Sequence, residues 1–231
     1  MPYLYIDPWY IILVVPAMLL AFWAQINVNT TFSRYSKVLA PSGMTGAESA
    51  RRVLEANGVT GVRIERISGN LTDHFDPKTN TIRLSESVYD ATTVSAVGVA
   101  AHEAGHAVQY AVGYAPMQLR AAIIPATNIG SQLAMPLVLL GLIFSSAMLV
   151  DIGILAFSMS TLFQLITLPV EFNASRRAVA TLESSCVSDT EVKGAKAVLR
   201  AAALTYVAAL AVSLASLLRI ILLFGNRNRR D

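Results

Sequence analysis

Five consecutive residues, His102-Glu103-Ala104-Gly105-His106, have the types and spacing of a metal site. On a helix, two histidines four positions apart lie on the same face, so their imidazole nitrogens can converge on one ion. Zinc is the metal that an H-E-x-x-H segment typically holds, and its glutamate can act as a base on metal-bound water. The segment therefore predicts His102 and His106 as zinc ligands and Glu103 as a general base.

The residues around this segment are typical of a buried helix. Asp90 is a candidate N-cap before it, Gly113 is a candidate stop after it, and most side chains between them are small and apolar. Two histidines and a glutamate on such a helix need polar partners, because unpaired polar groups cost free energy when buried. Bound zinc would supply the partner. The alternative is a pair of core histidines hydrogen-bonded to other side chains.

A third zinc ligand must come from elsewhere in the chain. With three histidines and one cysteine, the candidates are His74, Cys186 or a carboxylate. Catalytic zinc is often held by two histidines and one glutamate, with an open position for water. We favour Glu171, because it ends a long apolar segment, where a charge normally needs a partner. Two alternatives stay open: Glu171 could pair with Arg176 or Arg177 at the interface, and His74 could be the ligand, contact substrate or lie in an exposed loop.

The composition of the 231-residue chain is that of an integral membrane protein. Charged residues make up 14% of it and hydrophobic residues 54%, whereas soluble domains carry about 25% charged residues. The net charge of +3 is explained by basic residues that flank membrane spans, since no basic face with interleaved aromatics indicates nucleic-acid binding. A single cysteine excludes an intrachain disulfide.

Apolar runs predict about four transmembrane helices in a mainly α-helical membrane protein with a small α+β, zincin-like extramembrane part. The predicted segments are an anchor at 1–28, an α+β region at 29–115, and a C-terminal part at 116–231 that comprises a hairpin at about 131–170, a connector at 171–197 and a last helix at about 200–224. The hairpin is expected to turn near Asp151. Two spans between His106 and Glu171 return the chain to one side of the membrane, so the three predicted ligands can meet.

The α+β region is expected to contain one helix and a small sheet. Thr45 and Glu48 form a capping box for a helix that stops at Gly58. Alternating residues flanked by turn signals indicate strands at 62–67, 71–75 and 81–84. An edge strand of this sheet could pair with an extended peptide, or the sheet could only brace the metal helix.

The distribution of basic residues near the membrane ends predicts the orientation. The predicted catalytic side carries Arg34, Lys37, Arg120, Arg176, Arg177, Lys193, Lys196 and Arg200, and the opposite side carries Arg227, Arg229 and Arg230. The positive-inside rule then places the catalytic side in the cytoplasm and both termini outside, although the basic C-terminal tail favours the reverse.

Three stretches together resemble one bacterial family. They are Ala101–Gln109 with the H-E-x-x-H segment, Pro169–Ala178 with Glu171, and the region around His74, where residues 71–77 and 81–86 carry the resemblance. Over nearly its whole length the chain resembles the YugP-type neutral zinc metallopeptidases of bacterial membranes. Like the HtpX and Ste24 membrane proteases, that family combines an H-E-x-x-H segment with a later glutamate.

This resemblance implies one zinc ion held by His102, His106 and Glu171, with Glu103 as the base. It also implies a bacterial plasma membrane location and peptide or membrane-protein substrates. HtpX-like proteins carry an aspartate four residues after the ligand glutamate, where this chain has Ser175. The candidates for supporting a ligand or contacting substrate are therefore His74, Asn173, Ser175 and Arg176.

The predicted activity is that of a zinc-dependent membrane endopeptidase, a hydrolase in which Glu103 activates zinc-bound water. Arg176, Tyr110 and Tyr206 are candidate donors to the oxyanion. The alternative is a membrane scaffold or adaptor with a structural zinc site, which would be four-coordinate and closed. A third hypothesis, that the protein is a transporter, would depend on the charge of Asp151, but Asp151 is better explained as a turn residue.

Overall fold

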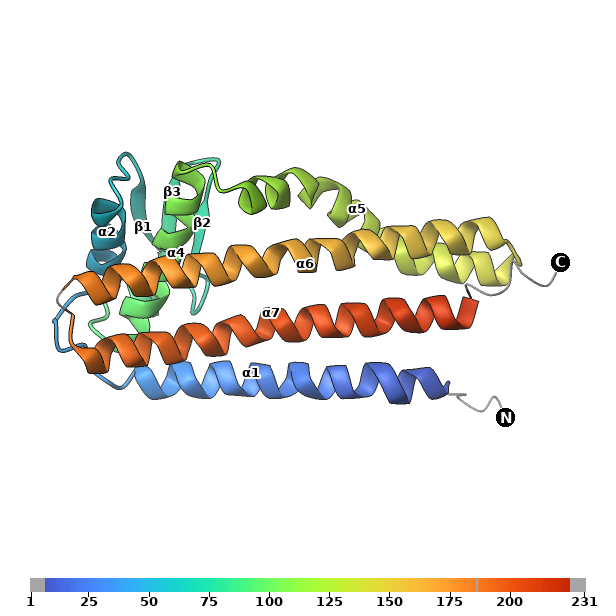
Figure 1. The fold of residues 1–231 in the computed structure, drawn as a ribbon, viewed down its shortest axis with the longest axis horizontal. Helices are drawn as coiled ribbons and strands as arrows, with labels where there is room; N and C mark the ends of the chain where they lie inside the picture. The colour runs from blue at the N-terminus through green and yellow to red at the C-terminus, as the bar shows by residue number, and fades with distance from the viewer. Residues whose placement is uncertain (1–6, 186, 225–231) are drawn as a thin grey trace. The chain divides into compact units, whose positions relative to one another are not determined.

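The computed structural model describes residues 7–185 and 187–224, so Cys186 and the arginines of the C-terminal tail lie outside the described residues. The described chain is mostly helical and has one small sheet of three strands (Figure 1). In order, its elements are a π-helical turn Tyr10–Val14, α1 Val15–Tyr35, α2 Gly46–Ala56, β1 Arg63–Ile67, β2 His74–Asp76, β3 Thr81–Ser85, α3 Glu86–Tyr89, α4 Val94–Ala111, α5 Ala115–Ile143, α6 Ala147–Ser184 and α7 Asp189–Phe224.

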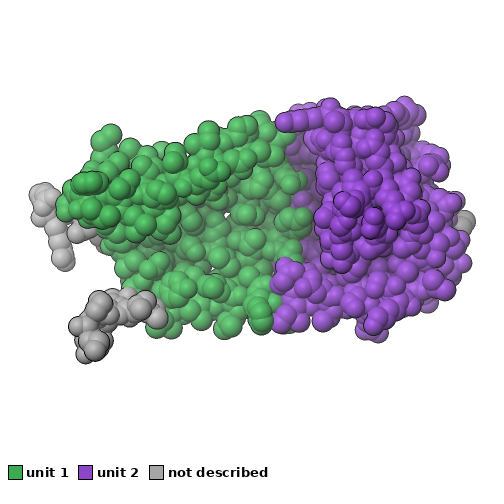
Figure 2. Space-filling view, turned by 180° about the vertical axis from the view of Figure 1, so that it is seen from behind, with its two compact units in different colours: residues 1–24, 119–168, 205–231 green, residues 25–118, 169–204 purple. Residues whose placement is uncertain are grey.

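The chain divides into two compact units (Figure 2). Unit 1 comprises residues 1–24, 119–168 and 205–231, and unit 2 comprises residues 25–118 and 169–204. The H-E-x-x-H segment and Glu171 both belong to unit 2, so their geometry can be described within one body.

Four helices among the described residues are long and apolar enough to cross a membrane. They are Tyr10–Tyr35, α5, α6 and α7. Together with the small sheet, they confirm the predicted helical membrane protein with about four spans and a small α+β part.

The hairpin turns earlier than predicted. The chain turns between Ile143, the end of α5, and Ala147, the start of α6, so Asp151 lies inside α6. Ser145 has a φ of 52°, and the next amide donates to the carbonyl of Gly141 at 2.8 Å, which closes the end of α5. A serine in the left-handed conformation gives a weaker sequence signal than glycine or asparagine, which explains the misplaced turn.

The sheet of unit 2 has the strand order β1-β3-β2, with β1 parallel and β2 antiparallel to β3. Ile82 lies opposite Ile64 of β1 and Phe75 of β2. β2 begins at His74 rather than at Leu71, because Leu71 has a φ of 55°, which a strand does not accommodate.

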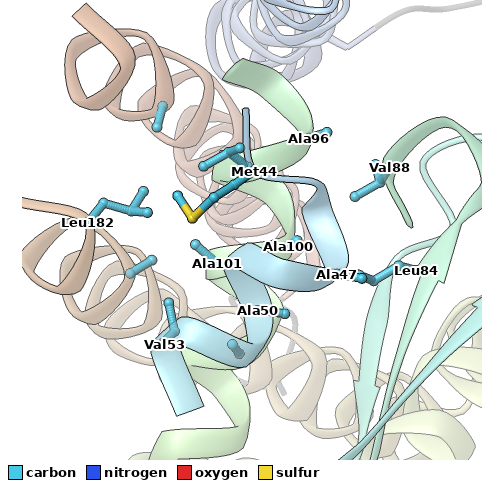
Figure 3. Packing of buried hydrophobic residues seen from close by; sticks show 14 of the residues in the cluster. Met44, Ala47, Ala50, Val53, Leu84, Val88, Ala96, Ala100, Ala101 and Leu182 are labelled. Atoms are coloured by element: carbon cyan, nitrogen blue, oxygen red, sulfur yellow. The ribbon is translucent and has the colours of Figure 1, made fainter. Parts of the chain in front are cut away.

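The predicted capping box opens α2. Thr45 Oγ1 accepts from the amide of Glu48 at 3.2 Å, and Glu48 Oε2 accepts from the amide of Thr45 at 2.8 Å. The apolar face of α2, which includes Ala50 and Val53, packs against α4 and Leu182 of α6 (Figure 3). This core holds α4, the helix with the H-E-x-x-H segment, against its neighbours in unit 2.

The start of α4 differs from the prediction, whereas its end agrees with it. Thr93 is the N-cap and accepts from the amide of Ala96 at 3.4 Å. Asp90 instead follows the short helix α3 and pairs with Arg66 at 2.8 Å. α4 ends at Ala111, and Gly113 adopts a φ of +65°, the left-handed conformation typical of a helix stop.

Candidate metal centre

The two histidines of the H-E-x-x-H segment and Glu171 meet in unit 2. His102 Nε2 lies 3.3 Å from Glu171 Oε2, and His106 Nε2 lies 3.6 Å from the same oxygen. The two imidazole rings are edge-to-face, with their centroids 4.6 Å apart. Glu171 is 3% exposed, so its carboxylate is turned into unit 2 and toward both rings.

These distances fit a zinc ion. Zinc binds histidine nitrogen and carboxylate oxygen at about 2.0–2.2 Å in tetrahedral geometry, which separates neighbouring donor atoms by roughly 3.3–3.5 Å. One nitrogen from each histidine and one oxygen of Glu171 all lie within 4.8 Å of one another. The set also has the composition of a catalytic zinc site, two histidines and one glutamate.

The charge distribution of the cluster favours a bound cation. Burial disfavours the charged form of His106, but the carboxylate of Glu171 beside its ring and the charge of Glu103 outweigh this effect, so the pKa of His106 is raised. The surroundings that favour a proton on this ring also favour a metal ion, which would replace the proton.

Each ring has a partner on its other nitrogen. His102 Nδ1 lies 3.1 Å from Ser175 Oγ of α6, and His106 Nδ1 lies 3.0 Å from Gln109 Oε1 of α4. Partners of this kind fix the orientation of metal-binding histidines. Both rings therefore present Nε2 to Glu171.

Gly105, inside the H-E-x-x-H segment, allows α4 and α6 to lie this close. A Cβ on Gly105 would lie 2.5 Å from the carbonyl oxygen of Ala174 and 3.2 Å from its Cα. Backbone atoms of a packed helix cannot give way as a flexible side chain can. This close contact between the helices thus lies next to His106 and three residues after Glu171.

We expect Gly105→Ala to lower zinc affinity by more than about tenfold, because the added methyl group displaces α6, and Glu171 with it, from the two histidines. Zinc titration of the purified variant measures the effect. Gly98→Ala is the matched control on α4, because a Cβ there would meet Ala195 at 3.2 Å, away from the cluster. Equal zinc affinity in the two variants would contradict this role of Gly105.

Glu103 is half-buried on α4, next to His102. Its negative charge acts on Asp73, which precedes β2. Burial raises the pKa of Asp73, hydrogen bonds from the amide and hydroxyl of Ser85 oppose this increase, and Glu103 adds to it. A second carboxyl group therefore lies near the predicted base.

The other predicted residues are placed as follows. His74 is exposed on β2, with Nδ1 2.8 Å from the carbonyl oxygen of Thr72, and it does not belong to the His102–His106–Glu171 group. Arg176 is exposed on α6. Tyr110 is exposed and packs against Phe75 of β2, with ring centroids 5.8 Å apart.

The remaining candidates lie on α6 and α7. Asn173 Oδ1 accepts from Gln109 Nε2 at 3.0 Å and from Arg177 Nε at 2.8 Å, so Arg177 contacts Asn173. Tyr206 belongs to unit 1 and is not placed relative to the cluster.

Sequence reasoning missed Gln109 and the role of Gly105. Gln109 follows His106 by three positions and lies on the same face of an otherwise apolar helix, which is the signal that could have identified it. Nothing in the local sequence distinguishes the close contact at Gly105 from that of an ordinary helical glycine.

Comparison with known proteins places this chain in a family. The family model described as "Putative neutral zinc metallopeptidase" matches residues 10–225. The chain belongs to this family. It is 49% identical to a Bacillus subtilis (strain 168) protein described as "Putative membrane protease YugP". The 218 aligned residues cover 94% of this chain and 97% of that protein. No solved structure matches. The family resemblance expected from the sequence is thereby confirmed.

Proposed function

We propose that this protein is a zinc-dependent membrane endopeptidase with one zinc ion held by His102, His106 and Glu171. The observation that carries the proposal is the convergence of both Nε2 atoms on Glu171 Oε2, at 3.3 Å and 3.6 Å. The family, and the relative described as a membrane protease, support hydrolysis of peptide bonds.

The chain's own residues divide the chemistry between them. Zinc held there would supply a Lewis acid that lowers the pKa of a water molecule and polarises a carbonyl group. Glu103 accepts a proton from the attacking water and delivers it to the nitrogen of the leaving amine. Ser175 holds His102 and Gln109 holds His106, so the ligands keep their orientation through the reaction.

β2 is the candidate surface for the substrate backbone. It forms an edge of the sheet, and its Phe75 contacts Tyr110 at the end of α4. An extended peptide that pairs with this edge would place its backbone beside the helix that carries Glu103.

A membrane scaffold with a structural zinc site is the competing function, and the coordination shell separates the two. A catalytic site has three protein ligands and one exchangeable water, whereas a structural site has four protein ligands. X-ray absorption at the zinc edge should show two histidine nitrogens, one carboxylate oxygen and one further oxygen that a hydroxamate displaces. A shell that contains four protein donors and is unchanged by hydroxamate would contradict the proposal.

The proposed orientation places unit 2 on the cytoplasmic side of a bacterial plasma membrane, in agreement with the positive-inside rule. In a Cys186→Ser background, a membrane-impermeant maleimide added to spheroplasts should label Ser145→Cys, in the α5–α6 turn, without lysis. Lys78→Cys, an exposed site in unit 2, should be labelled only after lysis. The reverse pattern would place the site outside the cell.

A further inference from the structure

One fully buried glutamine joins the two helices that carry the predicted ligands. Gln109 is 0% exposed and lies on α4, three residues after His106. Its side chain contacts His106, the carbonyl oxygen of Val170 and the side chain of Asn173. Because Val170 precedes Glu171, this single side chain connects one histidine ligand to the backbone beside the carboxylate ligand.

The partners of Gln109 on α6 allow only one orientation of its amide. The carbonyl oxygen of Val170 can only accept, so the atom 2.7 Å from it must be the donor Nε2. Asn173 Oδ1, 3.0 Å from the same Nε2, is held as an acceptor by Arg177 Nε, which can only donate and lies 2.8 Å away. Both amide hydrogens are therefore used on α6, and Oε1 faces His106.

This orientation determines which nitrogen of His106 carries the proton. Gln109 Oε1 can only accept and lies 3.0 Å from His106 Nδ1, so Nδ1 must donate. A neutral imidazole has one N–H, and the other nitrogen then keeps its lone pair. That nitrogen is Nε2, the atom that faces Glu171 Oε2.

His102 is held less strictly. Its partner, Ser175, has a hydroxyl group that can donate or accept, so either tautomer of His102 satisfies the 3.1 Å contact. The structure thus constrains the proton of one histidine and leaves that of the other free.

We propose that Gln109 is a positioning residue that fixes His106 in the Nδ1–H tautomer and thereby keeps the Nε2 lone pair available to zinc. The inference deepens the proposed function and rests on the zinc site assigned there. Substitution of such partners typically lowers metal affinity by about 10- to 100-fold.

Nitrogen-15 NMR of the metal-free, full-length protein in detergent micelles tests the proposal directly. The chain has three histidines, and single substitutions assign their signals. At a pH high enough that the ring nitrogens report neutral imidazoles, we expect the proton of His106 on Nδ1 in the wild type. In Gln109→Met, which keeps the length of the side chain, we expect it on Nε2, where it can donate to Glu171.

Zinc affinity supplies the second readout. We expect Gln109→Met to weaken zinc binding by about 10- to 100-fold, and Gln118→Met, the same change at an exposed position of α5, to leave it within about twofold. A glutamine with a merely structural role would lower the melting temperature without moving the His106 proton.

Two results would overturn the inference: a wild-type His106 with its proton on Nε2, or a folded Gln109→Met variant with unchanged tautomer and zinc affinity. The wild-type spectrum does not depend on whether any variant folds. Neither readout requires turnover, so absence of proteolysis would contradict the proposed function and leave this inference standing.

Discussion

Glu103→Gln is expected to keep zinc bound and to lower kcat by at least about 10²- to 10⁴-fold, the usual contribution of general acid–base catalysis. Glutamine has nearly the same shape as glutamate, but its amide cannot accept a proton from the attacking water. Glu103 does not belong to the ligand group, so the loss of its charge removes the base and leaves the three donors in place. Steady-state cleavage of an unfolded protein gives kcat, and zinc content is measured on the same sample.

The matched control for this change is Glu86→Gln, which makes the same substitution at an exposed position of α3. We expect that variant to cleave at the wild-type rate. A Glu103→Gln protein that binds zinc and cleaves as fast as wild type would show that another group is the base. Asp73 would then be the first candidate, because it lies within electrostatic reach of Glu103.

Glu171→Ala is expected to abolish tight zinc binding. Removal of the carboxylate leaves two protein donors instead of three and eliminates the negative charge that faces both rings at 3.3 Å and 3.6 Å. The affinity should fall by more than the roughly 100-fold that loss of an outer partner costs. Zinc content after dialysis against a weak chelator measures the change.

His74→Ala is the control for the ligand set, because His74 was the main alternative to Glu171. It is exposed on β2, and the described geometry does not include it among the three converging groups. We therefore expect His74→Ala to retain zinc. Loss of zinc in His74→Ala, with retention in Glu171→Ala, would contradict the proposed ligand set.

Much of the candidate site could be predicted because its spacing is local. His102 and His106 share a face in any helix, whatever surrounds it. Glu171 could be proposed from two independent constraints, its position at the end of an apolar segment and an even number of spans after His106. Neither constraint requires knowledge of how α4 and α6 pack.

The parts that could not be predicted depend on contacts between distant segments. Gln109 donates to the carbonyl oxygen of Val170, which is 61 positions away, and no local sequence pattern predicts that hydrogen bond. Two predictions are wrong for a related reason. The chain turns at Ser145 rather than near Asp151, and the N-cap of α4 is Thr93 rather than Asp90. Asp90 and Asp151 are stronger sequence signals, but the ends of α4 and α5 are set by backbone geometry and packing.

Cleavage of an unfolded model protein by the purified full-length chain in three states tests the central claim most directly. The states are zinc-loaded, stripped by a chelator and reloaded with zinc, all in detergent. We predict cleavage in the first and third states and none in the second. Cleavage that persists in the fully stripped protein would contradict the account, because peptide hydrolysis would then not depend on zinc held by His102, His106 and Glu171.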